Sequence, residues 1–532
     1  MKEIEIELHE ATANCNLLAV EILLRNKNID IESNNVLGLT PLIQASKSGC
    51  LEAVELLIKE GADVNKSDKL NITALMYACA NGFIDIAKVL IENGANINAL
   101  NINSETALHY ATSENYFNIT KLLVENNADV NIKTENDITP IMYACQKSNF
   151  EAVKLLAENN AILEDKDIYE ETVLSYAISS GNIDIVEYLL NKCNLEIPKY
   201  SLTLATISGN LSLVHYIHSK IGNKKSNVFS TALISAAHNG YLDIVRYFFD
   251  NSQKEAPKAL AMAASNGHLH IVKYFLENDV DPNGLSDEGK TALIYAIKLS
   301  NLDMVELLLK YNADINLACD DYITPLMYAS FSGNLEIVDR IINKKPSIDS
   351  LDNIGRDAYI HALISGNITV IELFKCRNIL FNSNNKISYL MWAVIYDNMK
   401  AVKYLIENDP NSITETDENG WSAFMFACAK GYYDIVKYMI KINPNIVNQK
   451  SNSLETPLMI ASEKNRLEIL KLLIKNGASI REENNNNDTA LSIAVSNNHS
   501  KICEELLKHY DTNELESIGN LLKEKIGKLN IL

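Results

Sequence analysis

Hydrophobic residues recur at helical spacing in two successive patterns within each stretch of about 33 residues. In the stretch that begins at Thr40, the threonine suits a helix N-cap, Pro41 suits the first helical position and Gly49 suits the helix end. A second apolar stripe follows at i, i+3, i+6 and i+7: Leu51, Val54, Leu57 and Ile58. The pattern predicts a pair of short helices, followed by a polar finger that turns back toward the next pair.

The same pair of patterns recurs along the whole chain. The 16 units begin at Ile6, Thr40, Thr73, Thr106, Thr139, Thr172, Tyr200, Thr231, Lys258, Thr291, Thr324, Asp357, Ser388, Ser422, Thr456 and Thr489. A sustained period of this length is typical of a solenoid rather than of a row of globular domains. Helices of about ten residues are unstable alone, so the apolar face of each pair must be covered by its neighbours.

The motifs of these units resemble ankyrin repeats over essentially the whole chain. The letters TPLIQASKSG from Thr40 and GADVN from Gly61 carry the resemblance most clearly. The resemblance implies an all-α solenoid of helix-turn-helix units with short β-hairpin fingers and a concave face that binds other proteins. The family's usual histidine three residues after the threonine is present as His109. Other units have Ile43, Met76, Met327 or Met459 at this position, and for them the resemblance does not imply the hydrogen bonds that the histidine makes.

The unit spacing divides the array into five parts: an N-terminal capping repeat (1–39), regular repeats (40–199), repeats with shortened fingers (200–290), further repeats (291–510) and a C-terminal capping helix (511–532). Short steps between units predict truncated fingers, preserved helices and altered curvature from Thr172 to Thr291. Glu170 replaces the turn residue of other fingers and predicts a changed finger. No linker rich in Pro, Gly or Ser interrupts the chain, which predicts one continuous array. The alternative for 511–532 is a docking helix for a partner.

The charge of the chain restricts its partners. The 48 basic and 68 acidic residues give a net charge of −20, which disfavours nucleic acid or an anionic membrane and favours a basic protein partner. The first ten residues lack a signal-peptide pattern, and no stretch of about 18 apolar residues occurs, so we expect no membrane insertion. We therefore expect a cytoplasmic monomer, with the nucleus as the other compartment. Nine cysteines without a C-x-x-C pair indicate reduced thiols.

The residues that could form a metal or catalytic site occupy ordinary positions of the repeat. Residues from Asp279 resemble the start of a calcium loop, but the twelfth position is Lys290 instead of the glutamate that calcium requires. His215 and His218 have the spacing of a metal pair, yet His218 occupies an apolar slot of the repeat. Three cysteines share one small-residue packing position, without a distinguishing base: Cys79, Cys145 and Cys428. We therefore predict no catalytic residue, no cofactor and no metal, and a protein that is not an enzyme.

Candidate contacts with a protein partner are of two kinds. An aromatic residue precedes the alanine of the first helix in eight units: Tyr77, Tyr110, Tyr143, Tyr176, Tyr295, Tyr328, Trp392 and Phe426. This ladder either packs between units or forms exposed hot spots of an interface. The polar candidates are Lys47 and Ser48 on a helix and Lys66, Asp68 and Lys69 in a finger. The predicted function is a protein-binding scaffold or adaptor. The alternatives are an enzyme or metal site hidden in the irregular middle repeats and a mechanical spacer.

Overall fold

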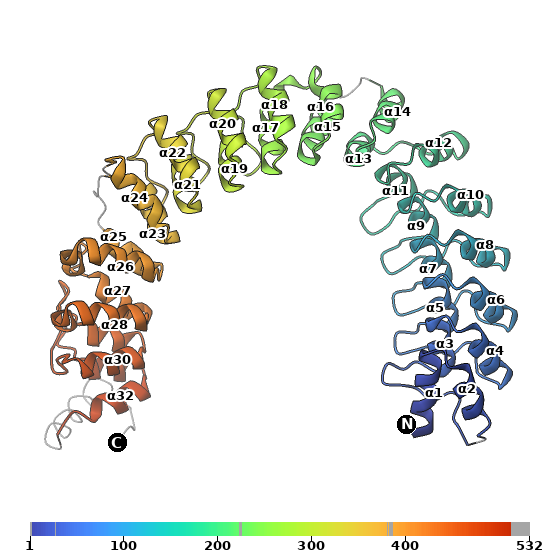
Figure 1. The fold of residues 1–532 in the computed structure, drawn as a ribbon, viewed down its shortest axis with the longest axis horizontal. Coiled ribbons are helices and arrows are strands. Elements are labelled where there is room, and N and C mark those ends of the chain that lie inside the picture. The colour runs from blue at the N-terminus through green and yellow to red at the C-terminus, as the bar shows by residue number, and fades with distance from the viewer. Residues whose placement is uncertain (1–2, 27, 223–225, 380, 382–386, 512–532) are drawn as a thin grey trace. The chain divides into compact units, whose positions relative to one another are not determined.

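A computed structural model describes residues 3–26, 28–222, 226–379, 381 and 387–511. These residues form 32 α-helices in 16 consecutive pairs, which confirms the predicted all-α ankyrin-repeat solenoid (Figure 1). The chain divides into two compact units, Met1–Glu255 and Ala256–Leu532. The sequence predicted one continuous array, and the boundary between the units falls within the stretch 200–290.

Unit 1 consists of eight helix pairs. They are α1 (Glu3–Ala13) with α2 (Leu17–Leu24), α3 (Pro41–Ser48) with α4 (Leu51–Lys59), α5 (Ala74–Ala80) with α6 (Ile84–Glu92), α7 (Ala107–Ser113) with α8 (Phe117–Glu125), α9 (Pro140–Gln146) with α10 (Phe150–Glu158), α11 (Val173–Ser179) with α12 (Ile183–Lys192), α13 (Ser201–Ile207) with α14 (Leu211–Ile221), and α15 (Ser226–Asn239) with α16 (Leu242–Phe249). A short 3₁₀ turn, η1 (Gln253–Glu255), ends the unit.

Unit 2 has the same organisation. Its pairs are α17 (Ala256–Ser265) with α18 (Leu269–Glu277), α19 (Ala292–Lys298) with α20 (Leu302–Lys310), α21 (Pro325–Ser332) with α22 (Leu335–Asn343), α23 (Ala358–Ser365) with α24 (Ile368–Cys376), α25 (Tyr389–Ile395) with α26 (Met399–Asn408), α27 (Ala423–Lys430) with α28 (Tyr433–Ile442), α29 (Pro457–Glu463) with α30 (Leu467–Lys475), and α31 (Ala490–Ser496) with α32 (Ser500–Leu507). Two 3₁₀ turns follow second helices: η2 (Pro410–Thr414) and η3 (Pro444–Asn448). The predicted capping helix 511–532 lies outside the described residues, apart from Asp511.

The pairs stack so that first helices form one layer and second helices form another. In unit 1, α3 packs on α1 and α5, while α4 packs on α2 and α6 (Figure 1). The apolar stripes meet between the layers, where Val54 and Leu57 of α4 have no exposed surface and Leu42 of α3 has almost none. Since each short helix covers its neighbours, the hydrophobic core runs along the unit as a continuous strip.

The first helices begin at side-chain caps. The Thr40 hydroxyl accepts the N–H of Ile43 at 3.3 Å, and Gly49 ends the helix with φ of 81°. His109 Nδ1 accepts the backbone N–H of Thr106 at 3.0 Å. Methionine sulfur takes the same role elsewhere: Met76 Sδ accepts the N–H of Thr73 at 3.5 Å. The replacement of histidine by methionine therefore leaves a weaker acceptor at this position.

The fingers make isolated antiparallel bridges, as between Ser67 and Thr73, and none of the described residues forms a longer strand. Their length varies along the chain: α4 ends at Lys59 and α5 begins at Ala74, whereas only eight residues separate α12 from α13. Glu170 has φ of 65°, close to the 58° of Asn71 in another finger. The prediction of a changed finger at Glu170 is therefore wrong, because the glutamate adopts the same left-handed turn.

Two further observations concern the cysteines and the helix lengths. Cys15 and Cys50 form a disulfide with a Cα–Cα distance of 5.4 Å, which joins the first helix pair to the second. The prediction of reduced thiols is wrong for this pair, whereas the other seven cysteines are free. Among the described residues, no helix combines the length and the apolar composition that a bilayer-spanning segment needs.

Candidate protein interaction surface

A tyrosine of the first helix forms a hydrogen bond with the finger that precedes that helix. The hydroxyl of Tyr77 donates to Asp68 Oδ2 at 2.9 Å, and Asp68 stands nine residues earlier in the chain. The same spacing recurs in other units, where the Tyr110 hydroxyl accepts from Asn101 Nδ2 at 2.8 Å and the Tyr176 hydroxyl donates to Asp167 Oδ2 at 2.7 Å. The hydroxyls of Tyr295 and Ser286 lie 2.9 Å apart, and the Tyr328 hydroxyl lies 3.8 Å from the Cys319 sulfur. Several members of the ladder that the sequence predicted are thus bonded to the fingers that precede them.

Asp68 organises its own finger. Its Oδ1 accepts the backbone N–H groups of Leu70 at 2.8 Å and of Ile72 at 2.9 Å, which closes the turn. With Oδ2 bonded to Tyr77, the carboxylate is satisfied within the repeat, and Asp68 is only 8% exposed. Asp167 makes the same set of bonds. Asp68 therefore supports the finger and is not the exposed contact that the sequence predicted.

The hydroxyl groups of Tyr77 and Tyr110 remain protonated at neutral pH. Burial, followed by the hydrogen bond to Asp68, raises the pKa of Tyr77 well above its usual value. Burial and the nearby carboxylate of Glu105 raise the pKa of Tyr110 to about 12. The hydroxyl groups therefore keep their bonds to the fingers across the physiological range of pH.

The other predicted contact residues differ in exposure. Lys47, Lys66 and Lys69 are exposed, and Ser48 is half-buried. The ladder residues Tyr77, Tyr110, Tyr143 and Tyr328 are half-buried, so one edge of each ring reaches the surface. Trp392 is only 7% exposed and lies near Tyr396, with ring centroids 6.2 Å apart. The structure therefore excludes Trp392 as an accessible contact, because its ring packs within the repeats.

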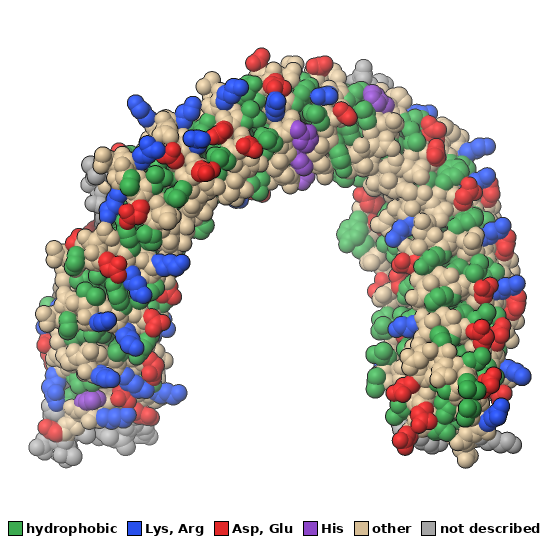
Figure 2. Space-filling view, viewed as in Figure 1, with side chains coloured by type: hydrophobic (Ala, Val, Ile, Leu, Met, Phe, Trp, Pro, Cys, Tyr) green, Lys and Arg blue, Asp and Glu red, His purple; other side chains and the backbone are tan. Residues whose placement is uncertain are grey.

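Six exposed apolar side chains of unit 1 lie at the finger tips, one or two residues after the position that Asp68 and Asp167 occupy in their fingers. They are Val36, Leu37, Leu70, Ile102, Ile168 and Tyr169, and the exposed fraction reaches 86% at Val36 and 76% at Tyr169. We call these six residues the tip row. Sequence reasoning missed them, although apolar residues inside a polar turn are themselves a signal. Figure 2 shows hydrophobic side chains along the edge of unit 1 from which the fingers project.

Backbone hydrogen bonds join the second finger tip to the third, the third to the fourth and the fourth to the fifth. The N–H of Ile102 donates to the carbonyl of Leu70 at 3.1 Å, that of Glu135 to Asn103 at 3.0 Å and that of Ile168 to Asn136 at 3.2 Å. The Lys69 ammonium also donates to the Val36 carbonyl at 2.9 Å. The fingers of unit 1 therefore form one continuous ridge with fixed spacing between its side chains.

The family comparison identifies this architecture. A family model described as "Ankyrin repeats (3 copies)" matches residues 7–68, 65–134, 108–201, 248–319, 373–450 and 441–516, and a single ankyrin repeat matches 321–353. The chain belongs to the ankyrin-repeat family. A comparison with curated proteins finds no match. Ankyrin repeats are in general protein-interaction modules and are typically not enzymes.

The ankyrin fold extends beyond the matched residues. The stretch 202–247, which no family match covers, contains all of α14 and α15 and most of α13 and α16. Their apolar faces follow the repeat pattern, since Leu213, Val214 and Ile217 of α14 have no exposed surface. These repeats therefore lack the finger motif of the family but keep its helix pairs.

The metal-like residues of the ankyrin array have structural partners. His218 Nδ1 lies 2.5 Å from the Tyr247 hydroxyl, and the ring of His215 packs on the same tyrosine. In the calcium-like stretch, Asp281 and Asn283 accept backbone N–H groups of their own finger and the next one. Among the residues described, no three His, Cys, Asp or Glu side chains converge as metal ligands.

The shared cysteine position of the ankyrin repeats is buried. Cys79, Cys145 and Cys428 have no exposed surface, and burial raises the pKa of each thiol well above its usual value. A thiol in this state is protonated and inaccessible, so these three cysteines serve packing.

Proposed function

We propose that this ankyrin-repeat protein is a non-enzymatic scaffold or adaptor that binds a protein partner along the finger ridge of unit 1. The observation that carries the proposal is the tip row, whose six apolar side chains stand exposed on a ridge with fixed backbone spacing. Exposed apolar side chains that recur along one ridge of a folded protein are typical of a place where another protein binds. A partner that covers the tip row would remove this surface from water.

The ridge is organised before any partner arrives. Asp68 and Tyr77 fix one finger, and the bond between Ile102 and Leu70 fixes the next finger against it. Loops that are ordered in the free protein lose little conformational freedom on binding, so more of the contact energy appears as affinity. Aromatic and aliphatic anchors held in this way are typical of interface hot spots.

Polar groups beside the tip row would set specificity. Lys66 and Lys69 are exposed in the second finger, and Lys47 places its ammonium 5.1 Å from the centre of the Tyr77 ring. Tyr77, Tyr110 and Tyr143 offer ring edges behind the ridge. The net charge of −20 over the whole chain favours a partner whose surface is basic. We further propose that the protein acts as a cytoplasmic or nuclear monomer and does not use nucleic acid as its partner.

Affinity capture with matched variants tests this proposal. The bait is the full chain, compared with a tip variant that carries Leu37→Ser, Leu70→Ser and Tyr169→Ser, and with a control that carries Leu18→Ser and Ile22→Ser on α2. Leu18 and Ile22 are also exposed, at 67% and 57%, but lie on a second helix. Melting curves establish that all three baits are folded.

We expect a protein that the wild type and the α2 control enrich and the tip variant loses. Equal enrichment by all three baits would place the binding site elsewhere on the array. If no protein is enriched by the wild type, the scaffold proposal fails and a mechanical spacer becomes the better account.

A further inference from the structure

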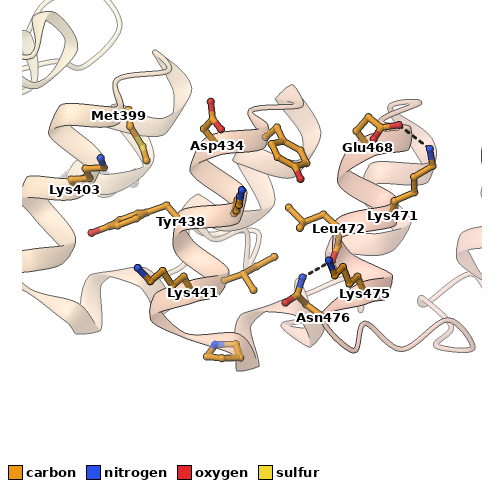
Figure 3. Close-up of a pocket in the computed structure, with 14 residues that line it drawn as sticks. Met399, Lys403, Asp434, Tyr438, Lys441, Glu468, Lys471, Leu472, Lys475 and Asn476 are labelled. Carbon is orange, nitrogen blue, oxygen red and sulfur yellow. Dashed lines mark hydrogen bonds and ion pairs between the residues drawn. The ribbon is translucent and has the colours of Figure 1, made fainter.

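A groove on the second-helix layer of unit 2 carries an unusual concentration of lysine. It has a volume of about 1010 Å³ and is lined by α26, α28, α30 and the start of η3 (Figure 3). Five lysines line it: Lys403 from α26, Lys437 and Lys441 from α28, and Lys471 and Lys475 from α30. The only acids in the lining are Asp434 and Glu468, so the groove is cationic on a chain whose net charge is −20.

Comparison between repeats shows why this arrangement stands out. The fifth and ninth positions of a second helix, counted from its start, lie one turn apart on the exposed side. In α4 they hold Glu55 and Lys59, in α6 Lys88 and Glu92, and in α8 Lys121 and Glu125. Helices α2, α10, α16, α18, α20, α26 and α32 also hold one basic and one acidic residue there. A pair of opposite charges at this spacing stabilises a helix, and a like pair destabilises it.

Helices α28 and α30 break this pattern, and they are neighbours. Both positions hold lysine in each helix: Lys437 with Lys441, and Lys471 with Lys475. Lys471 pairs with Glu468 at 2.9 Å, whereas Lys437, Lys441 and Lys475 form no ion pair with any described residue. Three of the four lysines in these two rows therefore lack an ion-pair partner among the described residues, and the like charges destabilise each helix.

The groove also offers apolar and aromatic surface between these rows. Leu472 and Met399 are half-buried, and the ring of Tyr433 is 41% exposed. Figure 3 shows Leu472 between Asp434 and the lysines of α30, and Tyr438 between Lys403 and Lys441. The stems of the lysines add further apolar surface beside their charged ends. A ligand that suits this groove must combine anionic groups with apolar ones.

We infer that this groove binds an acidic, amphipathic segment of a partner protein. Glutamates one helical turn apart on such a segment match the spacing of the lysines on α28 and α30, and leucines between them meet Leu472 and Met399. A polyphosphate backbone fits less well, because the lining has no arginine and because Asp434 and Glu468 interrupt the cationic surface. The proposed site uses none of the tip-row residues, and its partner has the opposite charge from the one proposed there.

Peptide binding to the full chain tests the inference. The probe is a fluorescein-labelled helical peptide of about 16 residues, about 24 Å long, with glutamate and leucine on one face. A second peptide has lysine in place of each glutamate. Fluorescence anisotropy is measured for the wild type, for Lys437→Glu with Lys471→Glu, and for a control with Lys59→Glu and Lys88→Glu. The control makes the same change in net charge at exposed lysines of two other second helices, at the ninth position of α4 and the fifth position of α6.

We expect the wild type and the control to bind the acidic peptide, more weakly as salt increases. The groove variant should bind it at least about tenfold more weakly and should instead bind the lysine peptide, because its groove charge is reversed. This gain of binding also shows that the variant is folded.

Three results would overturn the inference. The wild type could fail to bind the acidic peptide, or the control could lose binding as strongly as the groove variant. The third is tighter binding of a single-stranded oligonucleotide or of vesicles that contain phosphatidylserine, lost in the groove variant, which would make the groove a general polyanion site.

Discussion

The Tyr77 hydroxyl donates a hydrogen bond to Asp68 Oδ2, and this single contact ties a first helix to the finger that leads into it. Asp68 meanwhile closes the finger turn through the N–H groups of Leu70 and Ile72. The helix position, the turn and the finger tip are therefore mechanically connected within one repeat. The shape of the proposed binding ridge depends on this connection as much as on the side chains that a partner would touch.

Removal of the Tyr77 hydroxyl should loosen the finger. In Tyr77→Phe, Asp68 Oδ2 loses its donor in a half-buried place, and we expect a local destabilisation of about 1 to 2 kcal/mol. Faster hydrogen exchange at the amides of Leu70 and Ile72 would measure it. Tyr143→Phe is the matched control, since the Tyr143 hydroxyl bonds no described side chain and its counterpart, Thr134, bonds the N–H of Ile138. Equal effects in the two variants would contradict the assigned role.

Stability should depend on pH through His109. The ring is 1% exposed, and burial lowers its pKa to about 4 from an unfolded value of about 6.5. The unfolded chain therefore takes up the proton first as pH falls. The stability associated with the neutral ring is complete above pH of about 6.5 and is lost progressively down to about 4, a change of about 3 kcal/mol.

The variant His109→Met isolates this contribution. Met76 and Met142 occupy the same position in neighbouring repeats and accept the same cap N–H, so the substitution keeps the fold. Urea unfolding at neutral and at acidic pH should show a smaller acid-induced loss in the variant than in the wild type. An identical loss in both proteins would assign the acid sensitivity to other groups.

The Cys15–Cys50 disulfide should stabilise the first helix pair against the second. It closes a loop with a sequence separation of 35 residues, for which chain entropy predicts a contribution of about 4 kcal/mol. In Cys15→Ser, α1 and α2 should become more sensitive to protease. Cys376→Ser, which removes an exposed free cysteine, is the control. Alkylation of the unfolded chain without reductant should modify the seven free cysteines, and modification of all nine would refute the disulfide.

The finger that contains Glu170 should gain stability from glycine. Glu170 has φ of 65°, where a residue with a Cβ atom is strained, and its ion pair with Lys166 is exposed and contributes little. We expect Glu170→Gly to stabilise the finger by about 0.5 to 1 kcal/mol, measured by hydrogen exchange at Ile168. Asn71→Gly should change less, because asparagine tolerates this conformation. A loss of stability in Glu170→Gly would indicate that the side chain has a further role.

The helix pairs could be predicted from the sequence because their signals are local. The stripe of Val54 and Leu57 and the cap of Thr40 depend on residues within one or two turns, and the structure places them as expected. Glu170 was assigned wrongly because the preference of a residue for φ is weak, while the bonds of the surrounding finger are many. The disulfide depends on the approach of two loops that lie 35 residues apart, which no local pattern reveals.

The surface was harder to predict than the fold. From the sequence, Asp68 is expected to be a solvent-exposed aspartate in a loop. Its burial is explained only by its three hydrogen bonds taken together. The recurring interval of nine residues between Asp68 and Tyr77, or Asp167 and Tyr176, could have indicated this pairing. Trp392 illustrates the opposite error, since an aromatic ring at a potential interface position can equally fill the space between repeats.

The bonds that join the second to fifth finger tips, such as that from Ile102 to Leu70, use only main-chain atoms, and the bond to the first tip ends on the Val36 carbonyl. Exchange of a tip side chain therefore leaves the ridge itself intact. New partner specificities can arise, by evolution or by protein engineering, through replacement of Val36, Leu70 or Tyr169 without any redesign of the repeats beneath them. The array in effect separates the residues that determine its architecture from those that are available to change what it recognises.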